Sequence, residues 1–125
     1  MGNVTLKITK EHAQTKVPVL IFHLQGWLDA QSEEQLLAEA REEYDKGARY
    51  LLLDLAEVDS LTSAGMRAMQ KAHKLFTQTD EQFKVARVKI CNAPPQVYYV
   101  LGITGFLHNI PNFESQTAAL DSFGK

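Results

Sequence analysis

The feature that most constrains the fold is an apolar run in the middle of the chain, residues 50–55, which holds three consecutive leucines at positions 51–53. Successive side chains of a strand point to opposite faces, so consecutive leucines predict a strand that is buried on both faces. The run follows a segment with helical spacing of apolar residues that ends at Gly47, a residue well suited to the end of a helix. This strand is therefore expected at the centre of a helix-covered sheet.

The rest of the chain alternates predicted strands and helices around that central strand. Residues 4–9 and 17–25 each predict a strand, and the polar residues 11–16 between them predict a turn, so the two strands form an N-terminal hairpin. Ser32 precedes two glutamates and marks the start of the first helix. The elements expected after the central strand are a polar loop at 56–63, a helix through Phe76, a strand at 84–91, a helix from Pro94 to Gly102, a short strand at 106–110 and a closing helix at 115–123. This order predicts an α/β fold, a mixed β-sheet with about four α-helices.

Composition narrows the classes of protein that the chain can represent. The 125 residues are 45% hydrophobic and 22% charged, which fits a single globular domain over 1–125. The formal net charge is −2 and the basic residues are dispersed among acidic ones, so we expect no nucleic-acid partner. No apolar run reaches the roughly 18 residues of a membrane span, and no signal-like start is present. These features predict a cytoplasmic protein that inserts in no membrane.

The residues that most enzymes need are scarce. The chain has neither a phosphate-cradling glycine loop nor a paired-histidine metal motif nor a nucleophile elbow, and Cys91 is the only cysteine. Asp29, Asp54 and Asp59 follow strand ends and could converge on a weak divalent-ion or nucleotide site, although loop solvation and helix capping explain them more simply. We therefore expect a protein that is not an enzyme, with no metal and no cofactor.

The informative stretch is residues 51–66, where the buried strand leads through a loop to a helix start that carries two hydroxyls, Thr62 and Ser63. Either hydroxyl can cap the helix, which typically stabilises it by about 1 kcal/mol. The same place suits phosphorylation, because a helix start tolerates an added negative charge whereas a partner packed over it does not. Both interpretations stay open from the residues alone.

This stretch resembles the signature of the STAS domain family, which includes bacterial anti-sigma factor antagonists. Two more segments are similar to family turns: residues 26–30, Gly-Trp-Leu-Asp-Ala, before the first helix, and residues 101–106, Leu-Gly-Ile-Thr-Gly-Phe, after the third. Together the three segments and the order of elements cover nearly the whole chain. The resemblance implies a STAS-like fold, a mixed sheet with its helices packed mainly on one face.

The resemblance also implies a function in partner switching and transcription regulation. An unphosphorylated antagonist binds an anti-sigma factor that is also a serine kinase, phosphorylation ends the contact, and a phosphatase restores it. Ser63 falls on the acceptor position, with Thr62 as the alternative acceptor. The implied partner surface comprises Gly26, Trp27, Asp29, Asp59, Thr62, Ser63, Ala64, Gly65, Met66 and Arg67.

Some alternatives remain open in the sequence. Thr62 and Ala64 depart from the family pattern around the acceptor, which makes a non-phosphorylated accessory subunit of a transporter or signalling assembly the second hypothesis. A small-molecule sensor is the third. Trp27 fits either a side chain packed across the sheet edge or an exposed anchor for a partner. A monomer or a weak dimer is expected.

Overall fold

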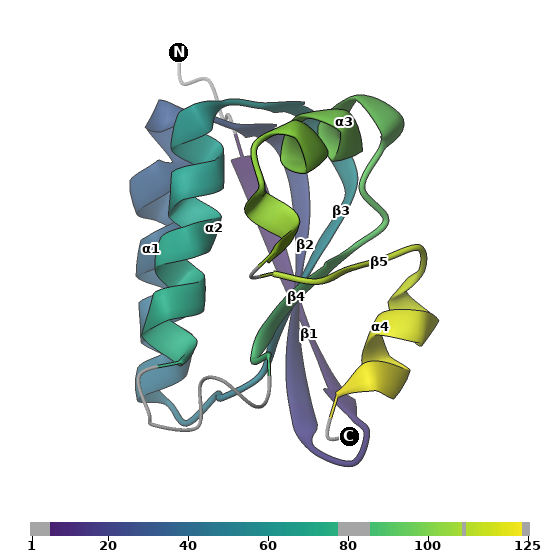
Figure 1. Cartoon of the computed structure of the whole chain (residues 1–125). Coiled ribbons are helices and arrows are strands. Elements are labelled where there is room, and N and C mark those ends of the chain that lie inside the picture. The colour runs from purple at the N-terminus through teal and green to yellow at the C-terminus, as the bar shows by residue number, and fades with distance from the viewer. Residues whose placement is uncertain (1–5, 78–85, 109, 124–125) are drawn as a thin grey trace.

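The computed structural model describes residues 6–77, 86–108 and 110–123, which form one five-stranded sheet with helices on both faces (Figure 1). The strands are β1 (Leu6–Gln14), β2 (Pro18–Leu28), β3 (Leu51–Leu61), β4 (Val88–Cys91) and β5 (Asn112–Phe113), and they lie in this order across the sheet. β1 and β2 pair antiparallel as the predicted hairpin, and each later strand is parallel to its neighbour. The mixed sheet is confirmed.

The helices divide between the two faces of that sheet. They are α1 (Ala30–Asp45), α2 (Ser63–Phe76), α3 (Pro95–Ile103) and α4 (Gln116–Ser122), with a 3₁₀ turn, η2, at Phe106–His108. In Figure 1, α1 and α2 lie side by side against one face, α3 lies near their N-terminal ends, and α4 covers part of the opposite face. None of the described helices has both the length and the apolar character needed to cross a membrane.

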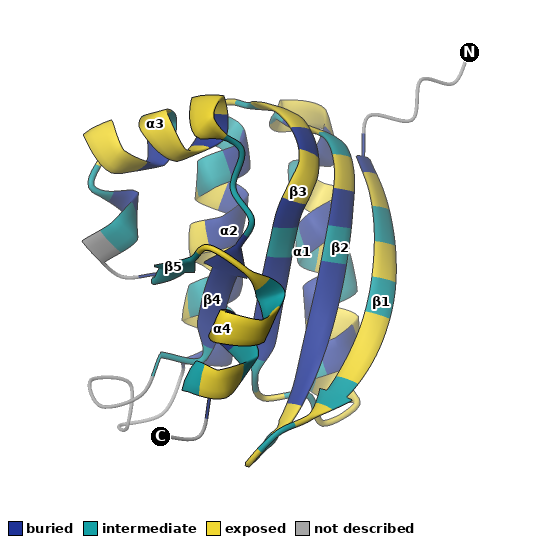
Figure 2. Cartoon of the chain, turned by 90° about the vertical axis from the view of Figure 1, so that its right-hand side faces the viewer, coloured by how far each residue is buried: buried dark blue, intermediate teal, exposed yellow. Residues whose placement is uncertain are grey.

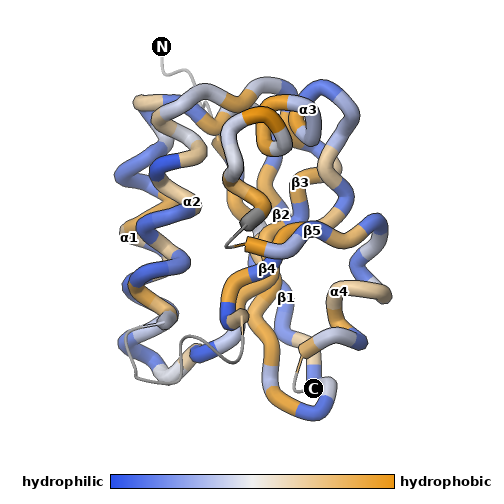
Figure 3. The backbone as a smooth tube through the Cα atoms, in the orientation of Figure 1, coloured by the Kyte–Doolittle hydropathy of each residue, from blue (hydrophilic) through white to orange (hydrophobic). Residues whose placement is uncertain are grey.

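The leucine run explains why the sheet is buried on both faces. Leu51 and Leu53 belong to the larger core under α1, α2 and α3, whereas Leu52 belongs to the smaller core under α4. The alternation of side chains along β3 therefore supplies both cores from consecutive residues. Figure 2 shows the inner strands largely buried beside a β1 that mostly alternates between partly buried and exposed positions. Figure 3 shows mostly hydrophobic residues along the inner strands and many hydrophilic residues along α1 and α2.

Several boundaries differ from the sequence-based prediction. Residues 11–14, expected in the turn, belong to β1, β2 continues past Gln25 to Leu28, and β4 begins only at Val88. Residues 56–61, expected as a loop, continue β3 to Leu61, because pairing with β2 extends the strand beyond its apolar centre. The first helix is capped by Asp29, three residues before the predicted cap. The strand predicted at 106–110 is wrong: η2 occupies its start, residue 109 lies outside the described residues, and the edge strand is β5. Residues 84 and 85 of the strand predicted at 84–91 also lie outside the described part.

Candidate functional site

Two helices begin side by side at one edge of the sheet because the strands before them are parallel neighbours. Leu28 at the end of β2 pairs with Leu61 at the end of β3. The next residue after each strand is a helix cap, Asp29 for α1 and Thr62 for α2. The sheet register thus brings residues 27–29 together with residues 60–67, which are the two segments that the sequence singled out.

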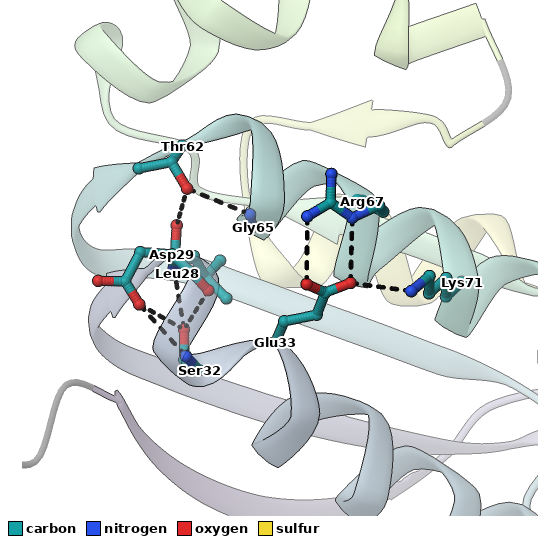
Figure 4. Close-up of polar contacts among 8 residues, drawn as sticks. All are labelled: Leu28, Asp29, Ser32, Glu33, Thr62, Gly65, Arg67 and Lys71. Carbon is teal, nitrogen blue, oxygen red and sulfur yellow. Dashed lines mark hydrogen bonds and ion pairs between the residues drawn. The ribbon is translucent and has the colours of Figure 1, made fainter.

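Hydrogen bonds of Thr62 link the start of α2 to the end of β2 (Figure 4). Its backbone N–H donates to the carbonyl oxygen of Leu28 at 3.0 Å. Its hydroxyl donates to the same carbonyl at 3.4 Å and accepts from the N–H of Gly65 at 3.4 Å. The hydroxyl of Thr62 is therefore occupied by the cap, as the capping interpretation predicted for one of the two hydroxyls.

Gly65 allows the first turn of α2 to approach this carbonyl closely. A Cβ atom at Gly65 would lie 2.2 Å from the oxygen and 2.7 Å from the carbon of the Leu28 carbonyl. Neither distance is possible between non-bonded atoms, so only glycine fits without a movement of the backbone. The glycine of the family-like segment is thus explained by packing between α2 and β2.

Ser63 occupies the first position of α2 and is exposed. Within the described part of the chain, its hydroxyl forms no hydrogen bond, since the neighbouring Thr62 supplies the cap. The first intrahelical bond runs from the N–H of Met66 to the carbonyl of Thr62. The cap of α2 therefore does not use the Ser63 hydroxyl, and Ser63 is exposed at the surface.

An ion cluster joins α1 and α2 next to these caps (Figure 4). The Arg67 guanidinium donates to both carboxylate oxygens of Glu33, with Nε–Oε2 at 3.2 Å and Nη2–Oε1 at 3.3 Å. The Lys71 ammonium lies 3.0 Å from Oε2 of the same carboxylate. Hydrogen bonds from Arg67 and Lys71 lower the pKa of Glu33 below its ordinary value. Arg67 and Lys71 of α2 thus both bind the single carboxylate of Glu33 on α1.

Two large apolar side chains are exposed close to this edge. Trp27 is 53% exposed at the end of β2, and Ile103 is 66% exposed at the end of α3. The next residue, Thr104, places its hydroxyl 3.4 Å from the sulfur of Met66 in the first turn of α2, so the end of α3 adjoins the start of α2. The exposure of Trp27 favours a partner anchor over a side chain packed across the sheet edge.

Of the other residues in the predicted surface, Gly26 and Asp29 stabilise the local backbone, whereas Asp59 and Ala64 have no such role in the described structure. Gly26 has a φ of +114°, a conformation that favours glycine, and lies at an irregularity in the pairing of β2 with β3. The Asp29 carboxylate accepts from the N–H groups of Gln31 and Ser32. Asp59 is exposed on β3, and Ala64 is partly buried.

Asp54 serves a second polar cluster, on the α4 side of the sheet. His23 lies between two carboxylates, with Nδ1 at 2.7 Å from Asp54 Oδ2 and Nε2 at 2.7 Å from Glu11 Oε1. Asn92, which has a φ of +61°, donates its side-chain amide to Asp54 Oδ1 at 3.1 Å. Asp54, Asp29 and Asp59 thus have separate environments. The described residues contain no group of acidic, histidine or cysteine side chains arranged to hold a metal ion.

The sequence profile of the STAS domain matches residues 10–119 of this chain. The chain belongs to the STAS domain family. This STAS domain is 35% identical over 105 residues to BtrV of Bordetella bronchiseptica, a candidate anti-sigma factor antagonist, in a match that covers 84% of this chain and 86% of BtrV. The family resemblance expected from the three segments is therefore confirmed.

Solved structures share the fold of this STAS domain. A candidate anti-sigma factor antagonist from Thermotoga maritima superposes with a TM-score of 0.80 at 14% identity, covering 94% of this chain and 95% of the other. The phosphorylated form of SpoIIAA, a cell fate determinant of Bacillus, superposes with a TM-score of 0.64 at 14% identity, covering 90% of this chain and 96% of the other. The similarity at these identities establishes the arrangement of strands and helices.

Sequence reasoning did not identify two residues at this edge. Glu33 was interpreted as an acidic residue in the first turn of a helix, and its ion pair with Arg67 joins positions 34 residues apart. Ile103 lies in the family-like segment after the third helix, but its local pattern does not reveal whether it is buried or exposed. Both gaps have the same cause: contacts between elements leave no periodic signal.

Proposed function

We propose that this STAS domain is an anti-sigma factor antagonist, without catalytic activity of its own, that binds an anti-sigma factor of the serine-kinase type. Phosphorylation of Ser63 by that kinase ends the contact, and a phosphatase restores it. The proposal places the protein in the cytoplasm, where such partners operate. Membership of the STAS family and the similarity to BtrV support the general function.

The observation that carries the proposal is the division of labour between Thr62 and Ser63. Thr62 and Ser63 are both exposed, but Thr62 uses its hydroxyl to cap α2 and to contact the Leu28 carbonyl, whereas Ser63 contributes no side-chain hydrogen bond to the described structure. A kinase can therefore modify Ser63 without undoing the cap. Modification of Thr62 would replace a hydrogen bond that fastens α2 to β2, which argues for Ser63 as the acceptor.

A phosphate at this place would act mainly on the partner. It adds roughly 1.5 to 2 negative charges at neutral pH. One neighbouring cation cannot balance this charge in full, and burying the excess in an interface costs several kcal/mol, with each 1.4 kcal/mol about a factor of ten in affinity. The fold can remain unchanged while binding is lost, and SpoIIAA in its phosphorylated form retains the same arrangement of elements.

The contact surface that we propose is centred on the start of α2. It combines the exposed residue Ser63 with the exposed apolar side chains of Trp27 and Ile103. Met66, in the first turn of α2, contacts Thr104 just after α3 and so links the two helix ends. Large apolar side chains beside a polar rim are typical of the energetic centre of an interface. Phosphorylation of Ser63 would thus introduce charge within the surface that binds.

The test is affinity capture from a lysate of the source organism with the wild-type protein, Ser63→Ala, Ser63→Asp and Thr62→Ser as bait. Wild type, Ser63→Ala and Thr62→Ser all retain a capped, uncharged helix start and are expected to capture the same kinase-like anti-sigma factor. Ser63→Asp is expected to capture at least tenfold less of it.

Incubation of the bait with the captured kinase and ATP, followed by mass spectrometry, then locates the phosphate. Phosphorylation of wild type and Thr62→Ser but not of Ser63→Ala is the expected pattern. Equal capture of a transporter or scaffold protein by all four baits would refute the switch and favour the docking-subunit alternative.

A further inference from the structure

Ser63, Arg67 and Lys71 lie at successive i, i+4 positions along one row of α2, directly above one another on the helix surface. The acidic partner of this row is Glu33 on α1, which contacts only its second and third members, Arg67 and Lys71. Ser63 therefore lies one helical turn from a guanidinium that already binds the Glu33 carboxylate.

Arg67 is exposed and has an N–H donor that no described residue uses, so it can bind a second anion. Its side chain is 54% exposed, whereas that of Glu33 is 15% exposed. Glu33 accepts from Nε and Nη2 of the guanidinium, and Nη1 has no partner among the described residues. Side chains at i and i+4 on a helix have Cβ atoms about 5 to 6 Å apart, within the reach of an arginine side chain to a phosphate on Ser63.

Charge favours a transfer of Arg67 from the carboxylate to a phosphate. A phosphorylated serine carries up to two negative charges and three acceptor oxygens, whereas Glu33 carries one charge and two oxygens. Glu33 would not be left unpaired, because Lys71 contacts the same oxygen, Oε2, that accepts from Nε of Arg67. Asp29, the acidic cap of α1, is occupied with the N–H groups of its own helix.

Resting on the proposed phosphorylation of Ser63, we infer that Arg67 is the residue that holds the phosphate and that it exchanges partners on modification. In the unmodified protein Arg67 binds Glu33. In the phosphorylated protein Arg67 binds the phosphate, and Lys71 alone keeps Glu33. The modification thereby weakens the link between α1 and α2 and moves one positive charge towards the partner surface.

The experiment uses the full chain with phosphoserine installed at position 63 during translation, which needs no kinase. The ³¹P resonance is followed through a pH titration in the wild-type background, in Arg67→Gln and in Lys71→Gln. The two variants are matched, since each removes one cation from Glu33 and leaves the other. Thermal unfolding of all three proteins checks that they are folded to the same extent.

A cation beside the phosphate favours its dianion, so the midpoint of the ³¹P titration is expected about 0.5 to 1 pH unit lower in wild type than in Arg67→Gln. Lys71→Gln is expected to raise the midpoint by less than Arg67→Gln does, because it removes only the cation that keeps Glu33 paired and leaves the guanidinium beside the phosphate. The Arg67 Nε–H signal in a ¹H–¹⁵N spectrum is expected to move on phosphorylation of wild type. Equal midpoints in wild type and Arg67→Gln, or a midpoint raised as much by Lys71→Gln, would overturn the inference.

Failure of this inference is distinct from failure of the proposed function. Equal midpoints together with loss of the anti-sigma factor from the phosphorylated protein would leave the switch intact and remove Arg67 from it. A lower midpoint in wild type together with unchanged partner binding would support the role of Arg67 and refute the switch.

Discussion

Substitution of Gly65 by alanine tests the close approach of α2 to β2. The added Cβ would lie 2.2 Å from the Leu28 carbonyl oxygen, whereas ordinary van der Waals contact begins at 3.4 Å, so the first turn of α2 must move by about 1 Å. That movement strains the two hydrogen bonds that Thr62 forms with Leu28 and the one that it accepts from Gly65. The substitution therefore disturbs both the cap and the packing.

The expected change in the free energy of unfolding is the sum of these separate contributions. Loss of the threonine cap costs about 1 kcal/mol, loss of the backbone hydrogen bond to Leu28 about 1 kcal/mol, and overpacking about 1 to 3 kcal/mol. Alanine returns about 1 kcal/mol through its better helix propensity. Gly65→Ala is expected to lower the free energy of unfolding by about 2 to 4 kcal/mol.

The assay is urea unfolding followed by far-ultraviolet circular dichroism, with Gly102→Ala as the matched control. Gly102 also lies in a helix, α3, but a Cβ atom there would have no atom within 4 Å. Gly102→Ala should therefore raise the free energy of unfolding by about 0.4 to 1 kcal/mol. A Gly65→Ala protein as stable as wild type, or stabilised like the control, would refute the packing argument.

Three other predictions follow from the contacts of Thr62, His23 and Trp27. Thr62→Ala should lower the free energy of unfolding by about 1 kcal/mol, whereas Thr62→Ser should retain the cap and most of the stability; equal losses in urea unfolding would contradict the capping role. Burial alone would lower the pKa of His23, but hydrogen bonds with Glu11 and Asp54 more than offset it and raise the pKa above its ordinary value. Protonation of His23 therefore stabilises the fold below about pH 6.5, and this stability is lost as pH rises through the raised pKa. The melting temperature of wild type should fall more than that of His23→Gln between pH 6 and pH 8.5, and parallel profiles would exclude this origin. Trp27→Ala should weaken partner capture at least tenfold with little change in melting temperature, because the side chain is 53% exposed; unchanged capture would remove Trp27 from the interface.

Burial patterns within single elements were sufficient to predict most of the fold. The leucine run identified the central strand, and the structure divides its side chains between the two cores. The single cysteine, Cys91, is buried on β4, where burial raises the pKa of its thiol to about 12, consistent with a small apolar residue. Such features are local because strand and helix periodicity depends only on which neighbours face the core.

The incorrect boundaries arose where pairing between elements overrides local pattern. Residues 56–61 mix polar with apolar side chains and were predicted as a loop, but β2 supplies a parallel partner for them and Val58 is buried in the core. Ser32 is a good capping residue by type, yet Asp29 caps α1 and the Ser32 hydroxyl accepts from the N–H of Asp29. The two residues form a reciprocal capping box, which places the serine inside the helix.

The order of elements and the segment that carries Ser63 follow from the amino-acid sequence, because the apolar periodicity and the family-like turns are properties of adjacent residues. Only the tertiary structure assigns the cap to Thr62 and leaves the Ser63 hydroxyl without a hydrogen bond among the described residues, since the Leu28 carbonyl that binds Thr62 lies 34 residues away. The same holds for the Glu33–Arg67 pair, also 34 residues apart, and for the exposure of Trp27. The pairing of parallel strands determines which residues distant in the sequence come into contact. The hydrogen bonds and ion pairs of the site form between those residues.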